Sequence, residues 1–344
     1  MCTSLTHRGP DEDGFYNAPG VGLAMRRLSV IDLQTGRQPI TNEDQTVWVV
    51  FNGEIYNYQE LTAQLQAKGH TFATRSDTET IVHLYEEHGL DFVQHLRGMF
   101  AIALWDTVRR RLVLVRDRIG EKPLFYSMAG ERLLFGSEIK AILQDQRARA
   151  VEPEAVCEFL AASYVPAPRT FFRGIHKLPP GALLMYENGR ATTRAYWERE
   201  LGRPSALPFP EAAQALTARL RETIRLCLKS DVEVGAFLSG GIDSSLIVAL
   251  ATATWSQGNL SGGTVSPPAS TQKTSRSVAA YTAGNFYRDF TNVWDTTIVC
   301  TVYGFIVGSV TLAYGDKFTA SQSKDGTHIL TVVFRLSWGR VLTN

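Results

Sequence analysis

A loop rich in glycine and serine, placed between an apolar segment and a helix, constrains the fold of this chain more than any other feature. The segment Val232–Leu238 predicts a strand, which runs into SGGIDSS at 239–245 and then into a predicted helix start at Leu246–Leu250. Glycines let a backbone turn tightly and approach an anion, and the amides at a helix start donate to phosphate oxygens. Strand, loop and helix in this order predict a parallel α/β unit that carries a phosphate site.

The residue types of the loop narrow the kind of phosphate ligand. It is not a Walker A motif, because no Lys-Ser or Lys-Thr pair follows the glycines. SGGxDSS is similar to the pyrophosphate loop of enzymes that adenylate their substrates by cleaving ATP between the α and β phosphates. Asp243 would be repelled by bare phosphate, so it implies a bridging Mg²⁺ or a special orientation. The alternative is a Gly-Ser turn that only caps a helix. The predicted ATP-binding residues of this loop are Ser239, Gly240, Gly241, Asp243, Ser244 and Ser245.

Charge and cysteine usage exclude several classes of protein. The 344 residues carry a formal net charge of +1, which gives no electrostatic footprint for a nucleic-acid partner. The four cysteines show no CxxC or close Cys/His spacing, so we expect neither a zinc ribbon nor a disulfide scaffold, and we predict no metal-ligating residues. The first residues contain no apolar run typical of a signal peptide, and a cytoplasmic location is expected.

The first 200 residues predict a mixture of strands and helices. Apolar runs at 47–51, 99–105 and 111–115 have strand length, and the last two are separated by a short polar segment that predicts a hairpin. Prolines between 163 and 181 indicate a connecting segment. Leucine or isoleucine recurs every four residues across 209–230, which predicts an amphipathic helix.

Six short segments of this region occur in an informative order. With SGGIDSS behind them, they resemble glutamine-hydrolysing asparagine synthetase, of the class II glutamine amidotransferase family, over roughly residues 1–255. The segments are HRGPD at 7–11, RLSVID at 27–32, FNGEIYN at 51–57, SDTE at 76–79, RGMFA at 97–101 and RDRIG at 116–120.

The resemblance implies a domain organisation. Residues 1–165 would form an α+β N-terminal-nucleophile domain, an αββα sandwich that hydrolyses glutamine, with its first strand and helix missing. Residues 166–208 would be a linker, and 209–255 would begin an incomplete α/β domain that binds the adenine nucleotide. The remaining residues, 256–344, form a tail of unrelated composition, without a single glutamate.

The resemblance also implies a reaction and its ligands. Glutamine, aspartate and ATP would be the substrates, with Mg²⁺ accompanying ATP, and a homodimer would be the partner state. Ammonia from glutamine would attack a β-aspartyl-AMP intermediate to give asparagine. By the same analogy Leu238 would contact the nucleotide. We expect this copy to be defective in synthesis, because the later ATP-site segments of the family are not found in 256–344.

Five residues are candidates for binding glutamine, by chemistry and by the resemblance. Arg27 can grip the α-carboxylate in a bidentate manner, and Asp77 and Glu54 offer anions to the α-ammonium. The side chain of Asn52 and the amide of Gly53 can form an oxyanion hole. Without the resemblance, Asn52-Gly53 would be interpreted as a hairpin turn and Asp77 as a helix N-cap.

The family's nucleophile is a cysteine exposed when the initiator methionine is removed, and Cys2 occupies that place. However, only Thr3–Thr6 separate it from HRGPD, and four residues span at most about 14 Å, too little for the family's intervening strand and helix. We therefore expect the chain to begin inside the domain, with Cys2 coincidental and no glutaminase activity. The alternative is a rearranged but working nucleophile.

The end of the chain and its function leave alternatives open. Residues 296–315 carry no charge over 20 positions, a length that can span a bilayer, although their β-branched residues equally favour paired strands in a soluble tail. Non-native coding is a third interpretation, and a membrane span is the least favoured. The chain could be a defective asparagine synthase, an amidotransferase acting on another carboxylate, or a non-catalytic remnant.

Overall fold

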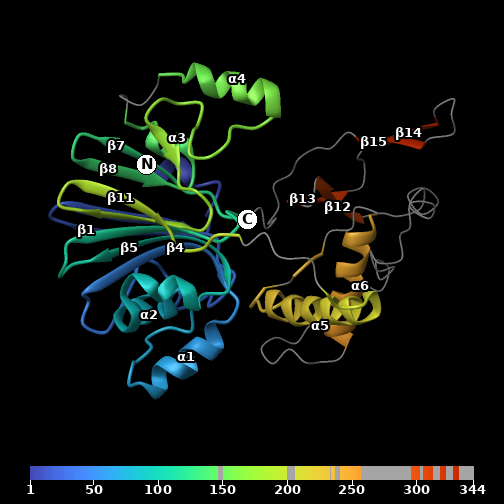
Figure 1. The fold of residues 1–344 in the computed structure, drawn as a ribbon, viewed down its shortest axis with the longest axis horizontal. Helices are drawn as coiled ribbons and strands as arrows, with labels where there is room; N and C mark the ends of the chain where they lie inside the picture. The colour runs from blue at the N-terminus through green and yellow to red at the C-terminus, as the bar shows by residue number, and fades with distance from the viewer. Residues whose placement is uncertain are drawn as a thin grey trace. The chain divides into compact units, whose positions relative to one another are not determined.

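The computed structural model divides the chain into two compact units, residues 1–204 and 205–344, shown in Figure 1. The structure describes residues 1–145, 150–199, 206–232, 234–236 and 241–256. Beyond these, it describes four strands, at 296–302, 305–312, 318–322 and 328–332.

A six-stranded sheet forms the centre of the first unit. Its strand order is β11-β10-β6-β5-β4-β3, and every neighbouring pair is antiparallel. β4 and β5 pair over nine residues each, and β5 and β6 form the hairpin that the sequence predicts. The strands are β3 (Ile40–Thr41), β4 (Val47–Ile55), β5 (Gly98–Asp106), β6 (Arg111–Arg116), β10 (Ala182–Glu187) and β11 (Arg190–Ala195).

Two apolar cores lie on opposite faces of this sheet. On one face α1 (Tyr58–Ala67), α2 (Glu79–His88) and the 3-10 helix η2 (Gly89–His95) cover side chains such as Val49 and Leu104. On the other face, residues such as Leu114 pack against two smaller sheets. These sheets are formed by β1 (Glu12–Ala18) with β2 (Val21–Arg27), and by β7 (Phe125–Ala129), β8 (Arg132–Gly136) and β9 (Ile175–Lys177).

Helix α3 (Ile139–Ile142) contacts β7 and β8 and completes a sequence of four layers: helix, sheet, sheet, helix. This architecture confirms the predicted αββα fold. A 3-10 turn, η1 (Cys2–Leu5), precedes the first sheet. Helix α4 (Pro153–Ala162) comes after α3 in the chain.

The linker predicted over 166–208 is wrong for most of its length. β9 joins the β7–β8 sheet, and β10 and β11 extend the central sheet. Leu183 and Leu184 point to opposite faces, and each is buried in a different core. The prolines that indicated a linker only mark turns around β9, whereas the apolar run after Gly181 supplies a strand buried on both faces.

The second unit has a helix pair in its described part. α5 (Phe209–Cys227) and α6 (Ile242–Ser256) pack through Ile224, Leu228 and Leu250, which confirms the amphipathic helix predicted at 209–230. The strand predicted over 232–238 is not formed by the residues described there, 232 and 234–236.

The four described segments near the end of the chain form two antiparallel pairs. β12 (Thr296–Val302) pairs with β13 (Phe305–Leu312), and β14 (Phe318–Gln322) pairs with β15 (His328–Val332). The uncharged stretch at 296–315 therefore contains paired strands. Among the described residues, no helix combines the length and the apolar character that crossing a membrane requires.

We predict that the buried carboxylate of Asp117 is a main stabilising group of the first unit, because it accepts hydrogen bonds from four backbone amides. Its donors are the amides of Phe100 (3.2 Å), Ile119 (3.2 Å), Glu121 (2.9 Å) and Lys122 (2.9 Å). Asp117→Ala strands these donors and should lower the free energy of unfolding by about 3 kcal/mol or more. Urea denaturation measures the loss.

Two further variants calibrate that measurement. Asp117→Asn keeps one acceptor oxygen and should lose less than the alanine variant. Val108→Ala removes a side chain that is 74% exposed and should change stability by less than about 0.5 kcal/mol. An alanine variant at 117 that is as stable as the wild type would contradict the role assigned to this carboxylate.

Candidate functional site

One edge of β4 carries a row of backbone amides that β5 does not use. Phe100 of β5 exchanges hydrogen bonds with Asp117, on the β6 side, so Gly53, which lies opposite Phe100, is in a non-hydrogen-bonded pair. The alternation of an antiparallel pair therefore directs the N–H groups of Phe51, Gly53 and Ile55 to the edge away from β5. β3 pairs only with Trp48 and Val49, before this point.

The carboxylate of Asp77 closes one end of this edge. Its Oδ2 accepts a hydrogen bond from the Ile55 amide at 2.8 Å, and the side chain is almost completely buried. Burial raises the pKa of Asp77 to about 6, against the opposing hydrogen bonds from Ile55 and Thr78. The N-cap interpretation is wrong, since Thr78 is the N-cap residue of α2 and makes no side-chain capping bond.

Gln38 closes the other end and was not found from the sequence. Its Oε1 accepts from the Phe51 amide at 2.7 Å, and its Nε2 donates to the Thr78 hydroxyl at 3.3 Å. The Gly53 amide therefore lies on the same edge between two amides, those of Phe51 and Ile55, that already donate hydrogen bonds to side chains. No short motif marks Gln38, because its role depends on the pairing of distant segments.

Asn52 and Gly53 lie inside a strand, so the hairpin-turn interpretation is wrong. Gly53 has φ of +154°, and a Cβ at this position would lie 2.0 Å from the carbonyl oxygen of Met99. Only glycine fits there.

Arg27 ends β2 and is nearly buried. Its guanidinium pairs with Glu12 at 3.1 Å and donates to the carbonyl oxygens of Ile31 and Asp32, at 2.6 and 2.8 Å. The Asp32 carboxylate in turn accepts from the Arg75 amide at 2.9 Å, two residues before Asp77. Hydrogen bonds thus connect Arg27, through Asp32, to the segment that contains Asp77. The ion pair with Glu12 occupies part of the Arg27 guanidinium, which was predicted to bind the α-carboxylate of glutamine.

Glu54 follows Gly53 and lies near a buried lysine. Burial lowers the pKa of Lys122 to about 8, and the charge of Glu54 is the main influence that opposes this shift. Lys122 is 1% exposed, so the two charges stabilise each other in a poorly solvated region. The region between β4 and Lys122 therefore holds charges of both signs.

Cys2 lies on η1 beside β2. Its Sγ donates to the carbonyl oxygen of Met25 at 3.6 Å, and burial raises the pKa of the thiol. A raised pKa reduces the thiolate fraction, which opposes a role as nucleophile. His7 and Arg8, which follow the turn, pair with Glu138 at 2.9 and 3.5 Å and are structural.

The predicted ATP loop is described in part. Leu238, Ser239 and Gly240 lie outside the described residues, whereas Gly241 immediately precedes α6. The hydroxyls of Ser244 and Ser245 donate back to the Gly241 carbonyl at 3.0 and 2.8 Å. Asp243 lies in the first turn of the helix.

Comparisons with known proteins agree with this geometry. Residues 1–197 match the family described as glutamine amidotransferase domain, and residues 215–285 match the family described as asparagine synthase. The four layers define an αββα sandwich of the N-terminal-nucleophile type. Since the first match covers more than half of the residues, the chain belongs to the glutamine amidotransferase domain family.

Curated relatives extend the comparison. The chain is 38% identical over 252 residues to asparagine synthetase [glutamine-hydrolyzing] 1 of Bacillus subtilis (strain 168), which covers 73% of this chain and 40% of that protein. It is 41% identical over 261 residues to asparagine synthetase 2 of the same strain, covering 72% and 34%. Amidase chyE of Penicillium rubens is 38% identical over 264 residues, covering 74% and 38%. The chain thus spans about two fifths of the length of these relatives.

We predict that Asp77 makes stability depend on pH in an unusual direction. Its pKa in the folded state, about 6, exceeds the ordinary 3.8, so the folded protein holds a proton that the unfolded chain releases. Stability from this group is therefore full at low pH and is lost as pH rises from about 4 to about 6.

The Asp77→Asn variant isolates this contribution from those of the other carboxylates. Relative to the Asp77→Asn variant, the wild type should lose about 2–3 kcal/mol of unfolding free energy as pH rises from 3.5 to 7. Denaturant titrations at both pH values measure it. A difference that does not vary with pH, or that varies in the opposite direction, would show that Asp77 is ordinarily ionised.

Proposed function

We propose that the first unit binds glutamine along the open edge of β4. The observation that carries this proposal is the position of the Gly53 amide. It lies between the amides of Phe51 and Ile55, which donate hydrogen bonds to the side chains of Gln38 and Asp77. A tetrahedral oxyanion formed from a side-chain amide would accept from Gly53 and from the Asn52 side chain.

The two ends of the amino acid would bind the flanking charges. The α-ammonium would bind Asp77, with Glu54 as a second anion, and the α-carboxylate would bind the Arg27 guanidinium in competition with Glu12. Asp77 is buried and its pKa is raised to about 6, so its ionised form is poorly solvated. An ammonium group beside it would stabilise that charge, which supports this assignment.

The overall reaction we propose is glutamine-dependent, ATP-driven amidation of aspartate through β-aspartyl-AMP, with Mg²⁺ at the phosphates, in a copy that is defective in turnover. The start of α6, which follows Gly241, would take phosphate through its first backbone amides. The hydroxyls of Ser244 and Ser245 donate to the Gly241 carbonyl and would have to turn to reach a phosphate. Asp243 would hold Mg²⁺. The weakly acidic Cys2 supports the absence of glutamine hydrolysis. We further propose that the chain works in the cytoplasm as a homodimer.

A second candidate differs in the acceptor. The chain is as similar to proteins named amidase chyE and amidase chry2, at 38% and 39% identity, as to asparagine synthetase 1, so the likeness alone does not single out aspartate as the acceptor. Calorimetric binding of aspartate and of a panel of other carboxylic acids, measured in the presence of ATP and Mg²⁺, separates the two without requiring turnover. Binding of aspartate alone would support the first candidate.

Glutamine binding should depend on the ionisation of Asp77. With a pKa of about 6, roughly a tenth of the carboxylate is ionised at pH 5 and nearly all at pH 7.5. Calorimetry should therefore find glutamine bound about tenfold more tightly at pH 7.5. Asp77→Asn should lose both the affinity and its pH dependence.

Asp91→Asn is the matched control, because Asp91 is an exposed aspartate of the same unit that pairs only with a surface arginine, Arg194. This variant should bind glutamine as the wild type does. Equal affinity in Asp77→Asn, or no glutamine binding at either pH, would refute the proposed site.

Turnover is tested separately from binding. We expect no glutamate release from glutamine, since the thiol of Cys2 is held by the Met25 carbonyl with a raised pKa. Measured glutaminase activity that disappears in Cys2→Ala would establish the rearranged nucleophile and contradict the defective assignment, while leaving the binding site intact.

A further inference from the structure

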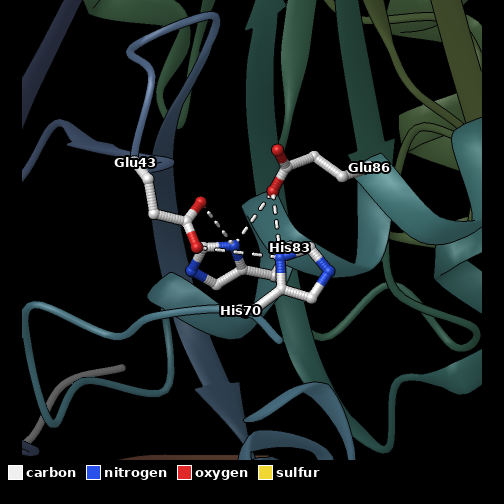
Figure 2. Close-up of side chains that lie close together, drawn as sticks. All are labelled: Glu43, His70, His83 and Glu86. Atoms are coloured by element: carbon white, nitrogen blue, oxygen red, sulfur yellow. Dashed lines mark hydrogen bonds and ion pairs between the residues drawn. The ribbon is translucent and has the colours of Figure 1, made fainter. Parts of the chain in front are cut away.

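A second group of polar side chains lies apart from the β4 edge and is unused by the proposed reaction. Two histidines and two glutamates converge there from three segments (Figure 2). Glu43 comes from the loop between β3 and β4, His70 from the segment after α1, and His83 and Glu86 from one face of α2.

The distances within this group suit a small four-coordinate cation. His83 Nδ1 lies 2.9 Å from Glu86 Oε2 and 3.5 Å from Glu43 Oε2, while His70 Nδ1 lies 3.6 and 3.8 Å from the same two carboxylates. Tetrahedral zinc with bonds of about 2.0–2.1 Å separates its ligand atoms by about 3.3–3.4 Å. These four separations bracket this value, and all the ligand atoms of the group lie within 4.8 Å of one another, so binding would draw the side chains somewhat closer.

Each histidine presents its second nitrogen to an outer carboxylate. His70 Nε2 hydrogen-bonds Glu87 at 3.2 Å, and His83 Nε2 lies 3.8 Å from Glu79. At His70 this outer hydrogen bond favours the tautomer that leaves Nδ1 for a metal. His83 Nε2 is buried without a hydrogen-bond partner in the described part of the chain, and its Nδ1 hydrogen-bonds Glu86 Oε2 at 2.9 Å, so a cation at this position would replace a proton.

The inner glutamates are also held from outside. Glu43 Oε1 accepts from the Thr71 amide at 2.7 Å, and Glu86 Oε1 accepts from the Asn42 side chain at 2.7 Å. His83 is completely buried, at 0% exposure. Hydrogen bonds from outside the cluster therefore orient His70, Glu43 and Glu86, and burial restricts His83, which lowers the entropy lost when an ion binds.

We propose that Glu43, His70, His83 and Glu86 form a structural site for one divalent cation of the zinc class. Two imidazole nitrogens and two carboxylate oxygens are a donor set that zinc accepts in closed tetrahedral sites. The ion would join the β3–β4 loop, the segment after α1 and helix α2.

The test uses the full chain, stripped of metal with a chelator and titrated with Zn²⁺ against a chromophoric competitor. We expect one equivalent to bind, and Co²⁺ in its place should give the visible absorption of a tetrahedral ion. His70→Gln should weaken Zn²⁺ binding by about 100-fold or more, and Glu87→Gln, which removes an outer carboxylate, by about tenfold.

His88→Gln is the matched control. His88 is also on α2 and stacks on another histidine, His95, with ring centroids 4.0 Å apart, but it lies outside the cluster. It should bind Zn²⁺ as the wild type does. If His70→Gln fails to fold, Glu43→Gln carries the test, because that glutamate is in a loop and partly exposed.

The outcomes are decisive in both directions. Stoichiometric binding that His70→Gln or Glu43→Gln weakens and His88→Gln preserves supports the site. An absence of stoichiometric binding to the wild type would show that protons alone hold the cluster together, and equal affinity in His70→Gln or an equal loss in His88→Gln would equally overturn the proposal.

Discussion

The pairing of β4 with β5 determines the rest of the first unit. Because the two strands are in register over nine residues, alternate amides of β4 have no partner in β5 and must be satisfied elsewhere. Gln38 and Asp77 accept two of these amides, which places the loop before β3 and the segment before α2 against the same edge. The candidate site is therefore a consequence of strand pairing: the amide of Gly53 lies where two neighbouring amides have already drawn in polar side chains.

The same constraint explains the unusual ionisation of Asp77. A carboxylate that accepts a backbone hydrogen bond normally has a lowered pKa, as Asp32 has with its bonds from Thr35 and Arg75. At Asp77 burial outweighs the hydrogen bonds, because its position between β4 and α2 excludes water. Asp32 is less deeply enclosed and remains ionised. Burial is the largest single influence on both aspartates, but the hydrogen bonds together outweigh it at Asp32 and not at Asp77, so the two pKa shifts have opposite signs.

How much of this could be predicted from the sequence depends on the range of each interaction. The apolar runs at 47–51 and 99–105 predicted the central strands because burial on both faces requires continuous apolar side chains. The linker prediction failed because prolines report local turns and not the distant strand that β10 pairs with. The N-cap prediction for Asp77 failed for the same reason: its acceptor oxygen is used by Ile55, 22 residues earlier in the chain. The family resemblance supplied the glutamine-site residues, whereas Gln38 has no local signature.

The histidine–glutamate cluster was missed because only His83 and Glu86 are close in the sequence: His70 lies 13 positions before His83, and Glu43 lies in a different loop. Helix α2 is shared by the cluster and the candidate glutamine site. His83 and Glu86 lie on its face, and Asp77 lies just before its first turn. Glu79, also on that face, accepts from the amides of Ala73 and Thr74 at 2.7 Å and so fixes the segment that leads to Asp77. The start of α2 therefore makes two connections: Glu79 binds the segment that precedes the helix, and Asp77, at the end of that segment, accepts from the Ile55 amide of β4.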